Sequence, residues 1–339
     1  MQASGRHAGL GLALVSAIAF GGSGVAAKPL IEAGLDPLHM VWIRVAGAAL
    51  VLSPLAWRHR DLLLRRPALL AGFGLVAVAG VQAFYFASLS RIPVGVALLL
   101  EYLGPALLLG WIRFVQRKPV TRAAAAGAAV AVVGLACVVQ IWSGLSLDPL
   151  GVVLGLCAAC CQAFYFVLAD QGADGKDAPD PLGVIAYGMI IGALVMTVIA
   201  RPWQLDWSVL AGRAEVAGAE VPAAVLVGWV VLVATVFAYL TGVVSVRKLS
   251  PQVAGVVACL EAVIATVLAW VLLGEHLDAP QILGGALVLG GAFIAQSSRA
   301  SGPAGDGAAV SGPAGDGASG DGADGAPAPT ALDREPTSA

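Results

Sequence analysis

Apolar residues occur along this chain in long blocks, each close to the roughly 20 residues that a helix needs to cross a bilayer core. None of the blocks shows the alternation of apolar and polar residues over about ten positions that is typical of membrane β-strands. The blocks predict ten membrane-spanning helices, near residues 8–31, 38–57, 68–89, 94–115, 120–141, 149–169, 181–200, 222–246, 252–273 and 279–298. The predicted fold class is therefore an all-α integral membrane protein of about ten transmembrane helices.

Composition supports this interpretation, because 59% of the 339 residues are hydrophobic and only 12% are charged. A soluble domain carries about 25% charged residues. The net charge of −2 favours no nucleic-acid partner. The cysteines all lie in apolar blocks without a histidine group to complete a metal site, so we expect them to pack helices: Cys137, Cys157, Cys160, Cys161 and Cys259. No P-loop, nucleophile elbow or dinucleotide fingerprint is present, so we expect no cofactor, no catalytic residues and no enzyme activity.

Basic residues predict the orientation of the helices. With the N-terminus in the cytoplasm, only Arg91, Arg201 and Arg213 lie outside, while Lys28 and Arg44 fall within spans. The other 14 of the 19 Lys and Arg residues then lie on the cytoplasmic side. This strong bias predicts a multi-pass protein of the inner (plasma) membrane with both termini in the cytoplasm.

The two halves of the chain resemble each other. Asp36-Pro37-Leu38 before the second span matches Asp180-Pro181-Leu182 before the seventh, and Leu100-Glu101 in the fourth span matches Leu260-Glu261 in the ninth. Further matches are Gly127 with Gly284 and Gly134 with Gly291. Five spans per half make the second half enter the membrane in the opposite sense, which is typical of carriers that work by alternating access.

We therefore predict three segments. Residues 1–143 form the first five-helix repeat and residues 144–299 form the second. Residues 300–339 are rich in Gly, Ala, Pro and Asp and cannot bury enough apolar surface to order themselves, so they form a disordered cytoplasmic tail. A longer loop at 201–221 carries Trp203 and Trp207, whose indoles suit a membrane interface.

Charged residues inside predicted spans are the strongest candidates for a site, because a charge in lipid normally faces a cavity or a partner. Glu101 and Glu261 are repeat mates, and Glu101 precedes Gly104-Pro105, where a helix can kink. Each carboxylate either binds a cation or a proton, or makes a structural contact between helices. Arg44 either holds a substrate carboxylate, pairs with a glutamate or reaches toward the interface. Lys28 either contacts substrate or pairs with Glu32, one turn further along the helix.

Neutral polar and aromatic residues within the spans are weaker candidates, because most such residues make packing contacts or hydrogen bonds between helices. The candidates for a cavity lining are Gln82, Tyr85, Tyr102, Gln162, Tyr165, Tyr187, Thr235 and Tyr239. The pentapeptide QAFYF occurs at 82–86 and again at 162–166, outside the repeat register. It indicates either similar aromatic linings or chance.

These features together resemble the EamA family of the drug/metabolite transporter superfamily over about residues 8–298. The most specific stretch is RIPVGVALLLEYLGP at 91–105, which is similar to the branch that includes threonine and homoserine exporters. Gly274-Glu275 before the tenth span also fits the family, whereas the C-terminal tail departs from it.

The resemblance implies a secondary transporter that exports small polar metabolites, with amino acids first and protons as a coupling ion by analogy. Its partners are then a small-molecule substrate and the lipid bilayer, and no pattern indicates an oligomeric state. The alternatives are a multidrug or nucleotide-sugar carrier and, less favoured, a membrane-embedded enzyme acting on lipid, for which no convergent catalytic cluster is found.

Overall fold

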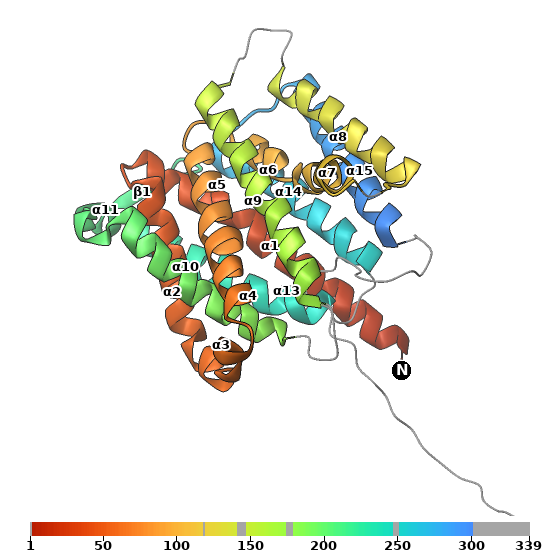
Figure 1. Ribbon diagram of the computed structural model, residues 1–339. Coiled ribbons are helices and arrows are strands. Elements are labelled where there is room, and N and C mark those ends of the chain that lie inside the picture. Colours follow the sequence, from red (N-terminus) through yellow and green to blue (C-terminus); the bar gives the residue numbers. More distant parts are fainter. Residues whose placement is uncertain (1, 118, 141–146, 174–178, 247–250, 301–339) are drawn as a thin grey trace, which may run out of the picture.

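The computed structural model describes residues 2–117, 119–140, 147–173, 179–246 and 251–300 as a bundle of helices (Figure 1). The predicted disordered tail beyond residue 300 lies outside this part of the chain. So do several basic residues that predict the orientation, such as Lys118, Lys176, Arg247 and Lys248. The orientation and the tail therefore stay predictions.

Six helical runs in the described part are long and apolar enough to cross a membrane: Gly11–Glu32, Pro37–Arg58, Pro67–Leu89, Val94–Val115, Pro181–Ala200 and Ala223–Val243. Four shorter apolar helices occupy the other predicted spans: Arg122–Val138, Pro149–Tyr165, Leu260–Leu273 and Ala279–Ile294. The predicted all-α membrane fold is confirmed, whereas the count of ten spans stays a prediction.

The elements follow the chain in order, and several spans consist of more than one helical segment. The first half contains α1 (Gln2–Glu32), α2 (Pro37–Arg58), α3 (Asp61–Arg65), α4 (Pro67–Gly72), the π-helical η1 (Phe73–Gly80), α5 (Val81–Leu89), α6 (Val94–Glu101), α7 (Gly104–Gly110), the π-helical η2 (Trp111–Val115) and α8 (Arg122–Val139). The second half contains α9 (Pro149–Ala173), α10 (Pro181–Ala200), α12 (Ala223–Gly228), the π-helical η5 (Trp229–Phe237), α13 (Ala238–Val246), α14 (Pro251–Leu273) and α15 (Ala279–Ala300).

The loop between α10 and α12 contains secondary structure that the sequence does not predict. It folds into the short helices η4 (Pro202–Gln204) and α11 (Trp207–Ala211) and an antiparallel hairpin of β1 (Arg213–Val216) and β2 (Ala219–Pro222). Ala217 at the hairpin tip donates its N–H to the carbonyl of Leu272 at 2.9 Å. The hairpin is therefore tied to the end of α14.

Repeat mates begin their helices in the same way. Asp36 accepts the N–H of Leu38 at 2.8 Å, and Asp180 accepts the N–H of Leu182 at 2.9 Å. In both cases a proline occupies the first turn, where its missing N–H costs nothing. The same short motif therefore caps α2 and α10.

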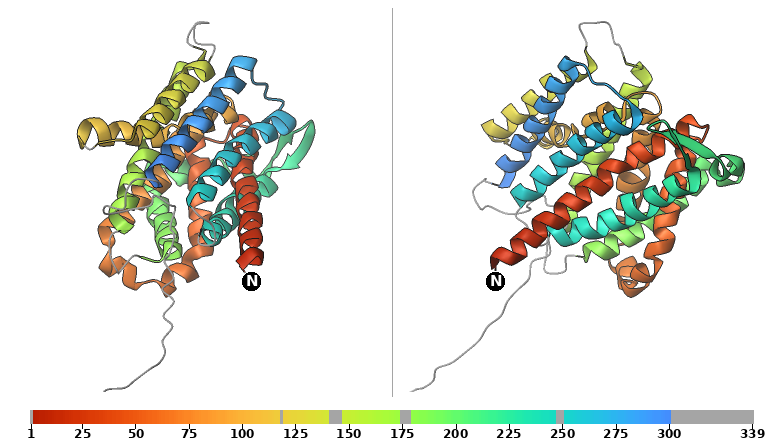
Figure 2. Two further views of the ribbon diagram at one scale, coloured as in Figure 1. Left: turned by 90° about the vertical axis from the view of Figure 1, so that its right-hand side faces the viewer. Right: turned by 180° about the vertical axis from the view of Figure 1, so that it is seen from behind.

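The helices of the two halves pack in symmetric pairs. α8 packs against its mate α15 and α2 against its mate α10, as the adjacent yellow and blue helices show for the first pair (Figure 1). α1 of the first half packs against α14 of the second half. Their repeat mates, α9 of the second half and α6 of the first, pack against each other in the same way. In the right-hand view of Figure 2, α1 and α14 run side by side. This pattern is what a pseudo-two-fold axis between the halves produces.

Glycines mark the closest approach of α8 and α15. A Cβ atom at Gly134 would lie 2.6 Å from the carbonyl oxygen of Gly284, and one at Gly291 would lie 2.5 Å from the carbonyl oxygen of Gly127. These two contacts exchange under the repeat, because Gly134 corresponds to Gly291 and Gly127 to Gly284. Small residues allow helix backbones in membranes to approach this closely.

Gly291→Ala is expected to destabilise the protein by about 1–3 kcal/mol, because the new methyl group would meet backbone atoms that cannot rotate away. The matched control is Gly290→Ala on the neighbouring position, where a Cβ meets nothing within 4 Å. That control is expected to be neutral or stabilising, since alanine favours helices over glycine. Thermal unfolding in detergent measures both variants, and equal melting temperatures would contradict the close α8–α15 crossing.

Candidate functional site

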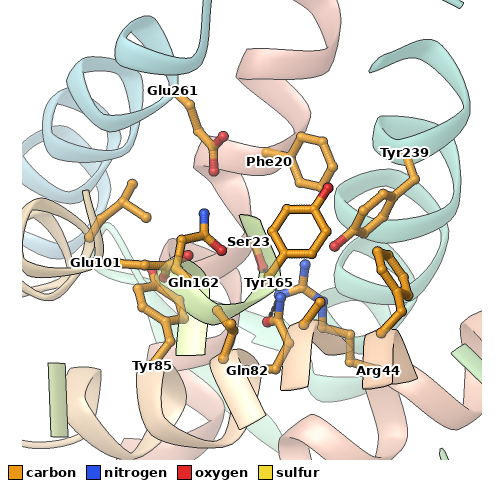
Figure 3. A pocket seen from close by; sticks show the side chains of 14 residues that line it. Phe20, Ser23, Arg44, Gln82, Tyr85, Glu101, Gln162, Tyr165, Tyr239 and Glu261 are labelled. Carbon is orange, nitrogen blue, oxygen red and sulfur yellow. Dashed lines mark hydrogen bonds between the residues drawn. The ribbon is translucent and has the colours of Figure 1, made fainter. Parts of the chain in front are cut away.

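A cavity of about 230 Å³ lies between the two halves, with walls that come from both. Its lining combines one cation, two carboxylates, two amides and several aromatic rings (Figure 3). The lining residues are Phe20, Ser23, Arg44, Phe73, Ala77, Val81, Gln82, Tyr85, Leu98, Glu101, Gln162, Tyr165, Tyr239 and Glu261. Of the twelve site candidates named from the sequence, eight therefore line one cavity, whereas Lys28, Tyr102, Tyr187 and Thr235 do not.

Arg44 is 4% exposed and is held by neutral partners. Its Nε donates to Thr235 at 2.8 Å, and its Nη1 donates to Ser23 at 2.8 Å and to Gln82 at 2.9 Å. Its Nη2 donates to the carbonyl of Ala234 at 3.4 Å. A guanidinium group has five N–H donors, so these bonds leave one donor on Nη2. The positive group is fixed in place with one donor still available.

Arg44 forms no ion pair with a glutamate in the part of the chain that the structure describes. Among the described residues, no carboxylate oxygen lies within 4.0 Å of its guanidinium nitrogens. Glu101 and Glu261 lie on the other side of the cavity from Arg44 (Figure 3). The side chain does not reach toward the interface either, because its bonds hold it inside the bundle. Neither structural explanation for Arg44 is found in the described part of the chain, and a buried cation with no described carboxylate within 4.0 Å favours an anionic ligand group.

Glu101 lies where the fourth span breaks. It is the last residue of α6, and α7 begins three residues later at Gly104. Pro105 has no N–H and cannot donate to the carbonyl of Glu101 as a continuous helix would require. We find no hydrogen bond from a described residue to the Glu101 carboxylate, although the side chain lines the cavity. Its oxygens can therefore accept bonds from a ligand.

Glu261 has a different environment from its repeat mate. It lies within α14, which runs without a break from Pro251 to Leu273. Its Oε2 accepts a bond from the Tyr102 hydroxyl at 3.5 Å. Tyr102, which follows Glu101 at the break, thus contacts a cavity carboxylate and does not line the cavity itself. The two glutamates meet at one cavity, and among the described residues Glu261 has a hydrogen-bond donor whereas Glu101 has none.

Both copies of the QAFYF pentapeptide contribute to the cavity. Gln82 and Tyr85 of α5 and Gln162 and Tyr165 of α9 all line it. α5 and α9 pack against each other, so the shared motif places similar side chains on the two facing helices. The pentapeptide is therefore a similar lining in both halves.

Ring pairs support two of the tyrosines in the wall. The ring of Tyr239 lies edge-on to Phe20, with centroids 4.9 Å apart, and that of Tyr165 lies edge-on to Phe73 at 5.5 Å. Edge-to-face contact is a favourable arrangement for aromatic pairs. Tyr187, another candidate, is buried in α10 away from the lining.

Several site residues escaped the sequence reasoning. Ser23 carries no charge and lies in a glycine-rich stretch, so only its bond to Arg44 marks it. Phe20 and Phe73 look like any other apolar position of a span. Thr235 was a candidate for the cavity lining. In the structure its hydroxyl oxygen instead accepts a hydrogen bond from Arg44 Nε.

Lys28 does not pair with Glu32. Its Nζ lies 2.5 Å from Oε1 of Glu275, which is 247 positions away in the chain. The expected pairing was wrong because Lys28 faces α14 and the start of α6, whereas Glu32 is exposed at the end of α1. Neither Lys28 nor Glu275 lines the cavity.

Comparison with known proteins identifies the family. The sequence profile of the EamA-like transporter family matches this chain twice, over residues 7–140 and 149–296. The threonine/homoserine exporter RhtA of Escherichia coli strain K12 is 28% identical over 244 residues, covering 71% of this chain and 75% of the exporter. The exporter of the same name from Salmonella typhimurium strain LT2 is 27% identical over 248 residues, with the same coverage.

A solved crystal structure of a protein aligns with 87% of this chain and 99% of its own, with a TM-score of 0.50 and 20% identical residues. At that identity the likeness supports the fold alone. The two profile matches, in contrast, cover more than half of the chain. This protein therefore belongs to the EamA-like transporter family, and it is a multi-pass membrane transporter.

Proposed function

We propose that this protein exports small zwitterionic metabolites, with amino acids first, by alternating access of the central cavity to the two sides of the inner membrane. The observation that carries the proposal is the distribution of charge in the cavity. Arg44 presents a cation that forms no ion pair with a described carboxylate, and Glu101 and Glu261 face it across the cavity. An amino acid carries a carboxylate and an ammonium group, so it complements both sides at once.

The size of the cavity supports a small substrate. Its volume of about 230 Å³ lies below the range of about 300–1,000 Å³ that is usual for drug-sized ligands. A nucleotide sugar would bring a diphosphate, and Arg44 is the single cation among the described lining residues. These two features favour an amino-acid-sized substrate over a multidrug or nucleotide-sugar carrier.

Sequence relatives support the same substrate class. The two similar proteins from Escherichia coli and Salmonella typhimurium are both described as threonine/homoserine exporters. Glu101 can also carry a proton across the cavity if it exchanges its proton with each side in turn, which would couple transport to a proton gradient. The basic-residue bias supports cytoplasmic termini.

The experiment is counterflow in liposomes. Full-length protein is reconstituted with unlabelled amino acid inside, and the entry of labelled threonine, homoserine and other neutral amino acids is measured with and without a pH gradient. We expect accumulation that depends on the trapped amino acid and responds to the gradient. Carboxylic acids and amines of the same size, each carrying a single charged group, should exchange poorly. Absence of counterflow for every amino acid tested would reject the substrate class.

A further inference from the structure

A second buried charged contact lies beyond the cavity, where α1 ends, α6 begins and α14 turns toward α15. Lys28 and Glu275 form its ion pair at 2.5 Å, with side chains only 14% and 12% exposed. Lys28 Nζ also donates to the carbonyl of Ile92 at 3.4 Å. The second oxygen of Glu275 accepts the N–H of Val94 at 2.9 Å. One pair of side chains thus ties three segments together.

The contact is connected to the cavity through α6. Val94 is the first residue of α6, and the preceding Pro93 provides no side-chain cap. The Glu275 carboxylate acts as the cap instead, because it accepts the N–H of Val94. A negative group at a helix N-terminus is favourable. The same eight-residue helix ends at Glu101 in the cavity wall. A movement of Glu275 would therefore act on the helix that positions Glu101.

An apolar layer separates the ion pair from the cavity. Val25, Val94 and Ala269 form a small buried cluster, each 3% exposed or less. A Cβ atom at Gly24 would lie 2.6 Å from the Tyr85 hydroxyl and 2.7 Å from a methyl group of Val94. The backbone of α1 therefore packs directly on both α6 and Tyr85, which lines the cavity.

The same order of layers appears along each helix. On α1, the cavity residue Ser23 is followed by Val25 and then by Lys28. On α14, the cavity residue Glu261 is followed by Ala269, and Glu275 follows the end of the helix. From the cavity outward, the path crosses a polar lining, a buried apolar layer and an ion pair.

We propose that Lys28 and Glu275 are the latch of a gate that closes the cavity toward the membrane face where α1 ends. The proposal rests on the proposed function, because a carrier that works by alternating access must open and close each side in turn. Lys28 lies in the first half of the chain and Glu275 in the second. A contact between halves that reorient is made in one state and broken in the other, and the structure holds it in the closed state.

The test measures access to the apolar layer and needs no substrate. The native cysteines are replaced by alanine in the full-length chain, and Val25→Cys supplies one reporter thiol. The protein is placed in lipid nanodiscs, where both faces are accessible, and its reaction with a water-soluble maleimide is followed. Glu275→Gln is expected to raise the labelling rate about tenfold, because losing the ion pair raises the population of the open gate.

A neighbouring ion pair provides the matched control. Arg91, which directly precedes Ile92, forms an exposed ion pair with Asp148 at 3.0 Å. Because an exposed pair contributes little, Asp148→Asn should leave the labelling rate unchanged. Lys28→Gln is the second variant, because it breaks the latch while Glu275 still caps α6. It should raise the rate as Glu275→Gln does.

Two results would overturn the latch. One is a labelling rate for Lys28→Gln equal to that of Asp148→Asn in protein that elutes as a single folded species. The other is a labelling rate for Glu275→Gln that also equals that of Asp148→Asn, which would make the contact structural only. If the labelling rates change as expected but no amino acid shows counterflow, the proposed substrate is rejected and the proposed gate is still supported.

Discussion

Replacing Arg44 with glutamine is expected to lower amino-acid counterflow by about 10- to 100-fold. A hydrogen bond to a charged group contributes about 1.5–3 kcal/mol, and each 1.4 kcal/mol corresponds to about a tenfold change in binding. Arg44 has no carboxylate partner within 4.0 Å among the described residues, and one of its donors remains for a ligand. Arg44→Lys should not restore transport, because an ammonium group cannot reach Thr235, Ser23 and Gln82 in the same fork geometry. Counterflow of labelled threonine measures both variants.

A smaller change separates a loss of binding from a loss of folding. Thr235→Val removes the acceptor for Arg44 Nε and leaves the charge in place, so it should weaken substrate binding less than Arg44→Gln does. The control is Thr241→Val, because among the described residues Thr241 bonds to carbonyls of its own helical run and not to Arg44. Normal counterflow in Arg44→Gln protein with an unchanged melting temperature would remove Arg44 from the site.

The second large effect is expected for Glu101→Gln, which should abolish the response of counterflow to the pH gradient and lower its rate about tenfold, as the loss of one charge-assisted bond does. Glutamine keeps the shape of the side chain but carries no exchangeable charge. Glu261→Gln should have the smaller effect, because Glu261 already accepts a bond from Tyr102, whereas Glu101 has no donor among the described residues.

Counterflow with and without a pH gradient measures both glutamate variants. Glu220→Gln, an exposed carboxylate on β2, serves as the control for loss of a single negative charge. A Glu101→Gln protein that still responds to the gradient would show that another group carries the proton. A larger effect at Glu261 than at Glu101 would reverse the roles of the two repeat mates.

Much of the architecture was readable from local patterns. The apolar blocks predicted the helices, and the Asp-Pro-Leu matches of the repeat prove to lie where α2 and α10 begin, because a cap depends only on residues within one turn. Gly104-Pro105 predicted the break after Glu101 for the same reason. The order of short matches predicted two related halves, and the crossing of Gly134 with Gly284 and Gly127 with Gly291 agrees with it.

The loop after α10 shows a limit of such patterns. Its β-hairpin was not expected, because strand pairing within 201–221 has no apolar alternation long enough to reveal it. The predicted pair of Lys28 and Glu32 failed for a related reason. Helical spacing shows that two residues share a face, but it does not show which partner that face meets.

Sequence by itself determined that this protein is a helical membrane transporter with repeated halves, and it named most of the charged and aromatic residues of the cavity. Only the tertiary structure decided what those residues contact. Arg44 is held by Thr235 from 191 positions away, and Lys28 by Glu275 from 247 positions away. The physical reason is that the role of a charge buried in a membrane protein depends on the groups that surround it in space. Helix packing determines those groups after the spans are formed.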